Sequence, residues 1–232
     1  MYFEHHNAIW NDFPTLAAGL LVVEQVSPAM PLANRANHYV EQAKVRLAGT
    51  SESELPQIQA WRRAFAQMGL KPTQYRSAAE ALLRRLRREG DLPALHPLVD
   101  LCNALSVAWA LPVAVIDLDQ IDGYIEVRYA DGDEIYTAWS GESEHPDVRE
   151  VIFADAGRAV HARRWTFRQS RQSTLSEHTR RALVVSEGLH AGAASDVAAL
   201  IDTLAAELTA ARFAPAGHTL LSAPMPRWEL PA

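Results

Sequence analysis

The sequence predicts an α+β fold. Helical and strand patterns are mixed along 232 residues without a regular alternation of strand, helix and strand. Apolar residues make up 48% of the chain, a composition typical of globular proteins with a substantial core. The length suits one large domain or two small ones.

The first 95 residues predict one strand and three helices. Residues 16–26 are almost continuously apolar, which is typical of a largely buried strand. A helix is expected from about 36 to 47. Ser53 is placed to cap a second helix, whose apolar face would carry Trp61, Phe65 and Met68.

The third helix has clear start and stop signals. Ser77 and Glu80 have the spacing of a capping box, and Gly90 can end a helix over 78–89. Its four arginines between 84 and 88 predict a solvated charged face, with phosphate contact as the alternative.

The second half predicts a helix, a series of short strands and a last helix. Pro97 suits the first turn of a helix that runs to about Ala110. Apolar runs and Asp-Gly turns then indicate strands at 113–116, 125–129, 134–138, 151–154, 160–164 and 182–186. Ser195 would cap a helix to about Ala211, and a proline-rich tail follows.

Charge is unevenly distributed over a chain of net charge −6. Residues 96–160 hold 3 basic and 13 acidic side chains, whereas residues 161–190 hold 6 basic and 2 acidic ones. From Arg163 to Glu187, arginines alternate with aromatic and hydroxyl side chains. Arginine forks suit phosphates and carboxylates, so this segment predicts contact with an anion. Since 20 of the 22 basic residues are arginine, a compositional bias explains the same pattern equally well.

Neither a metal site nor a cofactor motif is recognisable. The adjacent His5 and His6, near a terminus expected to be flexible, lack partner ligands at useful spacing. The single cysteine, Cys102, is expected to be a small buried hydrophobe, and it fits a reducing compartment. The sequence shows neither the pattern of a signal peptide nor a long apolar span, so we expect a cytoplasmic protein that does not enter a membrane.

The helix after Pro97 carries a polar stripe. Asp100, Asn103 and Ser106 are three residues apart and therefore share one face. This stripe indicates either internal bonds that brace a loop or the polar wall of a pocket, and the residues alone do not separate the two.

Several spaced motifs resemble the B3/B4 domain of the phenylalanyl-tRNA synthetase β subunit. They are Val99-Asp100-x-x-Asn103, Pro112, and Asp117-Leu118-x-x-Ile121-x-Gly123, followed by Arg-Arg-Trp-Thr-Phe-Arg-Gln-Ser from 163, Leu-Ser-Glu-His-Thr from 175 and a strand ending at Glu187. The later motifs resemble the free-standing branch of that family. The resemblance implies a B3/B4-type fold with mixed or antiparallel strands packed with helices. Its parts would be an N-terminal strand and helical part (1–95), a B3/B4 core (96–212) and the tail (213–232).

The resemblance implies a tRNA editing module that hydrolyses a misacylated aminoacyl-tRNA ester in trans. Its partner would be the 3′ end of a tRNA or aminoacyl-tRNA, or a free amino acid, and no cofactor would be needed. The alternatives are a non-catalytic domain that binds an RNA end or an amino acid, and a partner-binding domain with a vestigial pocket. The body of a complete tRNA ligase is missing from the motif pattern.

Glu187 is the central residue of the implied pocket. It matches the acidic residue that reads the polar end of a misacylated side chain, and its alternative role is a structural pair with an arginine such as Arg168. Arg164, Arg168 and Ser170 could bind a carboxylate, phosphate or ester carbonyl. Trp165 would share one face with Phe167 if their segment is extended, either as core or as a stacking surface.

The catalytic residue is not identified by the motifs. Asn103 matches a family position on the helix, as a support or as a substrate contact. The resemblance implies a histidine two residues after Pro112, where this chain has Ala114. His96, His161 and Arg168 are therefore the candidates for a catalytic role.

Overall fold

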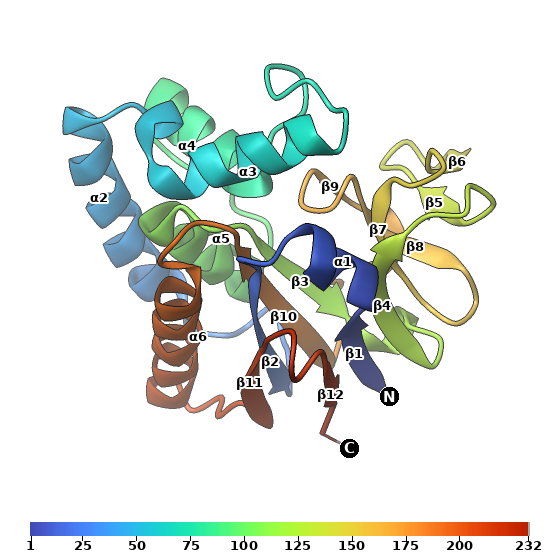
Figure 1. Cartoon of the computed structure of the whole chain (residues 1–232). Helices are drawn as coiled ribbons and strands as arrows, with labels where there is room; N and C mark the ends of the chain where they lie inside the picture. Colours follow the sequence, from blue (N-terminus) through green and yellow to red (C-terminus); the bar gives the residue numbers. More distant parts are fainter. Residues whose placement is uncertain (232) are drawn as a thin grey trace.

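The computed structural model describes residues 1–231 as a mixture of helices and strands (Figure 1). The α-helices are α1 (Asn7–Asp12), α2 (Ala33–Gly49), α3 (Pro56–Gln67), α4 (Ala78–Glu89), α5 (Pro97–Trp109) and α6 (Ala193–Ala210). The strands are β1 (Tyr2–His5), β2 (Ala17–Glu24), β3 (Val113–Asp117), β4 (Tyr124–Tyr129), β5 (Ile135–Thr137), β6 (Ser143–Glu144), β7 (Val151–Ala154), β8 (Ala159–Arg163), β9 (Arg168–Gln169), β10 (Arg181–Gly188), β11 (Gly217–Leu221) and β12 (Arg227–Glu229). The predicted α+β class is confirmed.

The strands form two sheets. One has four antiparallel strands in the order β11-β2-β10-β3. The other has eight strands, seven of them in the order β12-β1-β4-β7-β8-β5-β6, with β9 paired to β8. In the second sheet β1 runs parallel to β4 and β5 runs parallel to β8, so this sheet is mixed.

Strand β2 lies between two layers, which explains its almost continuous apolar sequence. Leu21 and Val23 pack into a core with the helices, whereas Leu20 and Val22 pack into a second core with the eight-stranded sheet. Successive side chains of a strand point to opposite faces, so a strand covered on both sides must be apolar throughout. Figure 1 shows α5 and α6 on one side of β2 and β10, with β4, β7 and β8 on the other.

Gly19 allows α6 to lie close to β2. A Cβ atom at this position would be 2.5 Å from Ile201 Cγ1 and 2.7 Å from Val197 Cγ1. These separations are too short for packed carbon atoms, so the helix could not keep this position above any larger residue.

Local signals set the ends of α4 and α5 as predicted. Ser77 Oγ accepts a hydrogen bond from the Glu80 amide at 3.3 Å, and Gly90 ends α4 in the left-handed conformation. Pro97 is the first residue of α5. The arginines of α4 make ion pairs with Glu52 and Glu89 on a largely exposed face, as expected of a solvated charged surface.

Two predicted helix caps are wrong. Ser53 lies inside a short 3-10 helix, Glu52–Glu54, which Ser51 caps, and α3 begins only after it. Ser195 lies in the first turn of α6, whose start has no side-chain cap.

Both ends of the described chain are more ordered than the sequence predicts. The N-terminal segment forms β1, which lies between β12 and β4 instead of being flexible. Within the proline-rich tail, β11 pairs with β2 and β12 pairs with β1. Strands this short carry little periodicity of their own. Pairing with neighbouring strands fixes them, and the sequence does not show that pairing.

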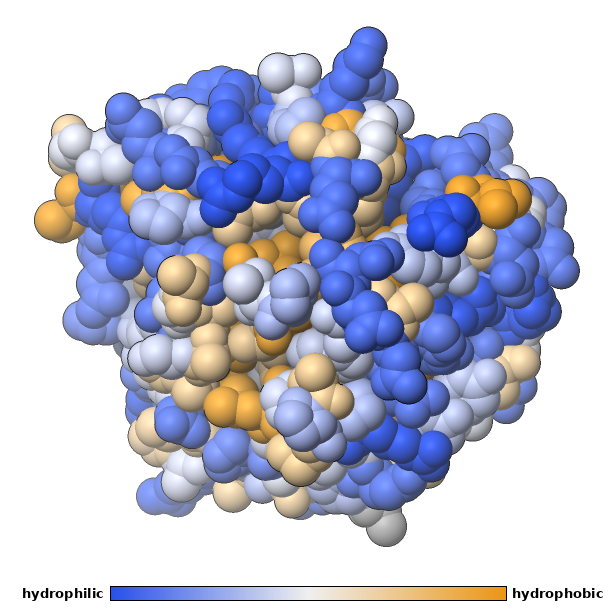
Figure 2. Space-filling model, viewed as in Figure 1, coloured by the Kyte–Doolittle hydropathy of each residue, from blue (hydrophilic) through white to orange (hydrophobic). Residues whose placement is uncertain are grey.

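The face drawn in Figure 2 is mostly hydrophilic, with hydrophobic residues gathered near its centre over α5, α6 and β2. Among residues 1–231, none of the helices combines the length and apolar character that a membrane crossing requires.

Candidate ligand pocket

A small cavity lies between the two sheets near the end of β10. It holds about 70 Å³, and its walls are mostly apolar. The four-stranded sheet supplies Ala114, Val185 and Glu187, and the eight-stranded sheet supplies Phe153 and Ala162. The segment from Trp165 to Gln169 also lines the space. We call it the Glu187 cavity.

Glu187 is a buried carboxylate, 2% exposed. Its Oε1 accepts a hydrogen bond from Trp165 Nε1 at 2.9 Å and lies 2.7 Å from His5 Nε2. Within residues 1–231, no protein group makes a hydrogen bond to Oε2. The carboxylate is therefore held at one oxygen, and the other can accept a bond from a ligand. The alternative in which Glu187 pairs with Arg168 is wrong.

The alternation of β10 places Glu187 on the cavity side. Leu183 and Val185 pack into the core between the two sheets. Glu187 follows them at the same two-residue spacing, so it points toward the same face. Ala114 pairs with Val185 in the adjacent strand β3 and lines the same cavity.

Trp165 reaches Glu187 from a turn and not from an extended strand. Arg164 and Trp165 have φ angles of 47° and 58°, in the left-handed region that residues with a side chain seldom adopt. The expectation that Trp165 and Phe167 share one strand face is therefore wrong. Trp165 is fully buried, and its ring packs edge-on against Trp61 at a centroid distance of 5.0 Å.

The turn is fixed by Glu150. Its Oε1 accepts from the Arg164 amide at 2.9 Å, and both of its oxygens accept from the buried Arg163 guanidinium at 2.9 Å. Arg164 itself lies over the Tyr75 ring, 4.9 Å from its centroid. The two arginines at the start of the basic segment therefore contact groups of the protein itself.

Three of the six predicted substrate contacts line the Glu187 cavity: Glu187, Trp165 and Arg168. Arg164 and Ser170 do not. Ser170 is buried, caps the 3-10 helix Arg171–Ser173 and donates to the Thr137 carbonyl at 3.1 Å.

The polar stripe of α5 mostly braces the chain. Asp100 accepts from the Leu95 amide at 2.8 Å, and Ser106 donates to the Leu111 carbonyl at 2.6 Å. Asn103 is half-buried on the same helix and does not line the cavity. For Asp100 and Ser106, the bracing interpretation is confirmed.

The structure brings neither histidine candidate to the cavity. His96 caps α5 by accepting from the Leu98 amide at 3.2 Å, and burial lowers its pKa, with Asp100 acting in the opposite sense. His161 is buried with Nε2 3.2 Å from Asp155 Oδ2. It precedes Ala162 on β8, so its side chain leaves the opposite face of that strand.

His5 is the residue that sequence reasoning missed. It is 1% exposed and reaches Glu187 from β1, across 182 positions of sequence. No local pattern marks this contact, since it depends on the placement of β1 in the sheet and on the packing of the two sheets.

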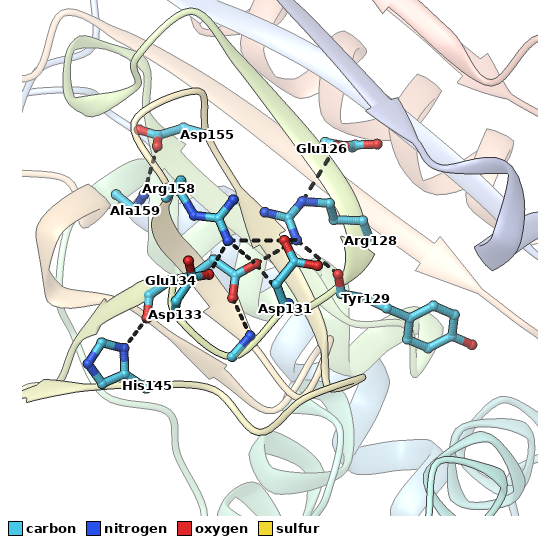
Figure 3. Close-up of polar contacts among 11 residues, drawn as sticks. Glu126, Arg128, Tyr129, Asp131, Asp133, Glu134, His145, Asp155, Arg158 and Ala159 are labelled. Atoms are coloured by element: carbon cyan, nitrogen blue, oxygen red, sulfur yellow. Dashed lines mark hydrogen bonds and ion pairs between the residues drawn. The ribbon is translucent and has the colours of Figure 1, made fainter.

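An acidic cluster lies outside the cavity, at the turn before β5. The side-chain oxygens of Asp131, Asp133 and Glu134 lie within 4.8 Å of one another, a spacing that a cation could use. Two arginines pair with these three carboxylates (Figure 3). Arg158 Nη2 lies 3.0 Å from Asp131 Oδ2 and also contacts Asp133, and Arg128 Nη1 lies 2.6 Å from Glu134 Oε1. The cluster is an ion-pair network that holds the turn.

Glu134 should make stability depend on pH. Burial raises the pKa of Glu134. Hydrogen bonds from backbone amides, including those of Asp131 and Gly132, and from the Arg128 guanidinium lower it by more, so the pKa falls from 4.5 to about 2. Because the folded pKa is depressed, the stabilisation is present above about pH 4.5 and is lost as pH falls toward 2. Glu134→Gln is expected to reduce the free energy of unfolding by about 2–3 kcal/mol near neutral pH and to flatten its decline over that interval. Urea denaturation across the interval tests this, and equal slopes for both proteins would contradict it.

Fold and cavity together define an α+β domain of two sheets with one buried carboxylate at a pocket. Residues 60–205 match the B3/4 domain family, and the chain belongs to that family. A similar protein is the phenylalanine–tRNA ligase beta subunit of Nitrosococcus oceani, 35% identical over 79 residues. That match covers 34% of this chain and 10% of the relative, so the chain matches about a tenth of the relative's length. A similar solved structure is an N-terminal fragment of the phenylalanyl-tRNA synthetase beta-subunit from Pyrococcus horikoshii, with a TM-score of 0.46 and 7% identity, covering 92% of this chain and 49% of that one.

Proposed function

We propose that this chain binds the aminoacyl end of a mischarged tRNA and hydrolyses the ester in trans. The observation that carries the proposal is Glu187, a buried carboxylate at an apolar cavity with one oxygen bonded by the protein. A ligand side chain with a hydroxyl or amine could donate to Oε2. A purely apolar side chain would leave this oxygen unpaired, which disfavours its binding.

Membership of the B3/4 family supports this proposal. One similar protein is a subunit of phenylalanine–tRNA ligase, and the motif resemblance implies that the residue at the position of Glu187 reads the polar end of a misacylated side chain. Because the chain matches only a tenth of that relative, the proposal concerns removal of an amino acid and not its attachment. We place the activity in the cytoplasm.

The proposed reaction is a simple ester hydrolysis. The oxygen of a water molecule bonds to the ester carbonyl carbon, the bond from that carbon to the terminal ribose oxygen breaks, and the ribose oxygen takes one of the protons of that water. An aminoacyl ester is already activated, so orientation and polarisation can supply much of the rate. Arg168 is the cationic side chain at the cavity wall and could stabilise negative charge on the carbonyl oxygen.

The alternative function is non-catalytic binding of an amino acid or an RNA end. Ala114 favours it, because this residue lines the cavity where the resemblance implies a histidine. Among the described residues that line the Glu187 cavity, none is a histidine, cysteine or serine.

Filling the cavity should block the activity. Ala114→Leu adds bulk to the wall and leaves Glu187 with its two partners, so we expect deacylation to fall by about a hundredfold or more. Glu187→Ala should remove the preference for side chains that carry a donor. Release of the amino acid from a panel of mischarged tRNAs measures both effects. Ala81→Leu, on the exposed face of α4, is the matched control and should keep the wild-type rate.

The two functions predict different results. If no ester is hydrolysed while an amino acid or RNA binds and Ala114→Leu weakens that binding, the catalytic proposal fails and the binding alternative holds. Affinity that falls steeply with salt would indicate phosphate contacts, and salt-independent affinity would indicate a neutral amino acid. If wild type neither binds nor hydrolyses these ligands, both functions are rejected.

A further inference from the structure

A separate cavity lies where α1 and α3 end, beside the turn that precedes β7. It holds about 360 Å³, a size found among small-molecule sites, and no residue of the described chain lines both this cavity and the Glu187 cavity. We call it the Arg149 pocket. Its polar lining includes Asp12, Tyr129 and Arg149, and its apolar lining includes Phe13, Met68 and Leu70.

Arg149 presents an unpaired guanidinium to this pocket. The residue is exposed, and among residues 1–231 no carboxylate lies within 4.0 Å of its side chain. The neighbouring Glu150 has both oxygens bonded to Arg163. Arg149 has a φ angle of 66°, in the left-handed region, and its amide donates to the Ala130 carbonyl at 2.8 Å. Side-chain-bearing residues held in this region occur often at ligand sites, so this turn was a place to look for one.

Asp12 supplies the opposite charge. Its Oδ2 accepts from the Tyr129 hydroxyl at 2.5 Å, and within residues 1–231 no protein group makes a hydrogen bond to Oδ1. Burial raises the pKa of Tyr129 to about 12, with the bond to Asp12 acting in the same sense and Arg149 in the opposite one, so the phenol keeps its proton at neutral pH. Gln67 Nε2 donates to the Asp12 carbonyl at 3.0 Å and fixes the backbone there. One carboxylate oxygen therefore remains to accept from a ligand.

Tyr129 separates the two charges by the length of one side chain. The Arg149 guanidinium lies over the Tyr129 ring, 4.6 Å from its centroid, and Asp12 lies at the hydroxyl end. A small molecule that carries a cation and an anion a few bonds apart can reach both groups. A ligand with a single charge would leave either Arg149 or Asp12 without a partner.

We propose that the Arg149 pocket binds a free α-amino acid with an apolar side chain. The ligand carboxylate pairs with Arg149, because a guanidinium fork matches the two carboxylate oxygens. The ligand ammonium donates to Asp12 Oδ1. The ligand side chain packs on the apolar lining, Phe13, Met68 and Leu70. The site is distinct from the Glu187 cavity, and it does not depend on the proposed hydrolysis.

Isothermal titration calorimetry with free amino acids tests the proposal. The probes are L-leucine, L-methionine and L-phenylalanine, and at least one of them should bind wild type. Glycine should bind about tenfold more weakly or less, because it has no side chain to bury. Ala114→Leu, which fills the Glu187 cavity, should leave the affinity for these amino acids unchanged.

Two variants remove the charged partners. Arg149→Gln and Asp12→Asn should each weaken binding of the tightest probe about tenfold or more. Arg212→Gln and Asp119→Asn change exposed residues that do not line the pocket, and as matched controls they should bind like wild type.

Two analogues of the tightest probe assign its orientation. The amide lacks the carboxylate, and the acid without the amino group lacks the ammonium. Each should bind wild type about tenfold more weakly than the amino acid. Arg149→Gln should not weaken the amide further, and Asp12→Asn should not weaken the deaminated acid further, because each variant removes a group that the analogue does not use.

Several results would overturn the proposal. They are no binding of any of the three probes to wild type, and wild-type affinity in either Arg149→Gln or Asp12→Asn. Binding that Ala114→Leu abolishes and Arg149→Gln leaves intact would place the amino acid in the Glu187 cavity. That result would also overturn the proposal, and it would support the non-catalytic alternative for the Glu187 cavity.

Discussion

Replacement of His5 by leucine is expected to lower the free energy of unfolding by about 3–5 kcal/mol. The imidazole and the Glu187 carboxylate are both almost fully buried and lie 2.7 Å apart. Removal of the histidine leaves a buried carboxylate with Trp165 as its one remaining donor in the described chain. A buried charge that loses one partner cannot recover the solvation it gave up on folding. Urea denaturation followed by circular dichroism measures the loss.

Two further variants test whether the effect comes from the pair. His178→Leu changes a histidine whose side chain is 86% exposed, and should alter stability by less than about 0.5 kcal/mol. The double variant His5→Leu, Glu187→Leu should be more stable than His5→Leu alone, because no charge remains buried. If His5→Leu is neutral, or if the second substitution adds its full cost to the first, the pair does not stabilise the fold as we expect.

Local chemistry made part of the fold predictable. The ends of α4 follow from Ser77, Glu80 and Gly90, whose side-chain and backbone preferences act within a few residues. The burial of Cys102 follows from its apolar neighbours in α5, and burial also raises the pKa of its thiol. Signals of this kind need no knowledge of which segments meet in space.

The composition of the cavity depends on contacts that no local signal carries. His5 meets Glu187 across 182 positions because β1 joins the eight-stranded sheet. The left-handed turn at Arg164 and Trp165 has no glycine or asparagine to announce it. Trp165 therefore approaches Glu187 from a direction that an extended segment would not allow.

Charge counts could not show which arginines remain free. Carboxylates from the acidic stretch 96–160 lie beside the first arginines of the basic segment. Glu144 and Glu150 neutralise Arg163, and Asp147 lies 3.8 Å from Arg164. Of the six arginines in the expected anion-binding segment, Arg168, Arg171 and Arg180 are exposed and form no ion pair with a carboxylate among residues 1–231. An excess of one charge in a sequence predicts a binding surface only when the opposite charges fold elsewhere.

Glu150→Ala is expected to cost about 3–5 kcal/mol of stability and to disturb the cavity as well. Glu150 accepts two hydrogen bonds from the buried Arg163 guanidinium and one from the Arg164 amide at the left-handed turn. Burial lowers the pKa of Arg163, and the Glu150 bonds raise it above its usual value. A guanidinium is not deprotonated in proteins, so Arg163 stays charged when Glu150 is removed. The variant thus leaves a buried cation and an unbonded amide at the turn.

Glu144→Ala is the matched control, because Glu144 contacts the same arginine from a position that is 37% exposed. Exposed ion pairs contribute little, so this variant should lose no more than about 1 kcal/mol. Because Trp165 belongs to this turn, Glu150→Ala should also shift the indole N–H resonance of Trp165, which reports its bond to Glu187. Glu144→Ala should leave that resonance in place. Equal losses of stability in the two variants, or an unmoved indole resonance in Glu150→Ala, would show that Glu150 does not hold the turn that aims Trp165 at the cavity.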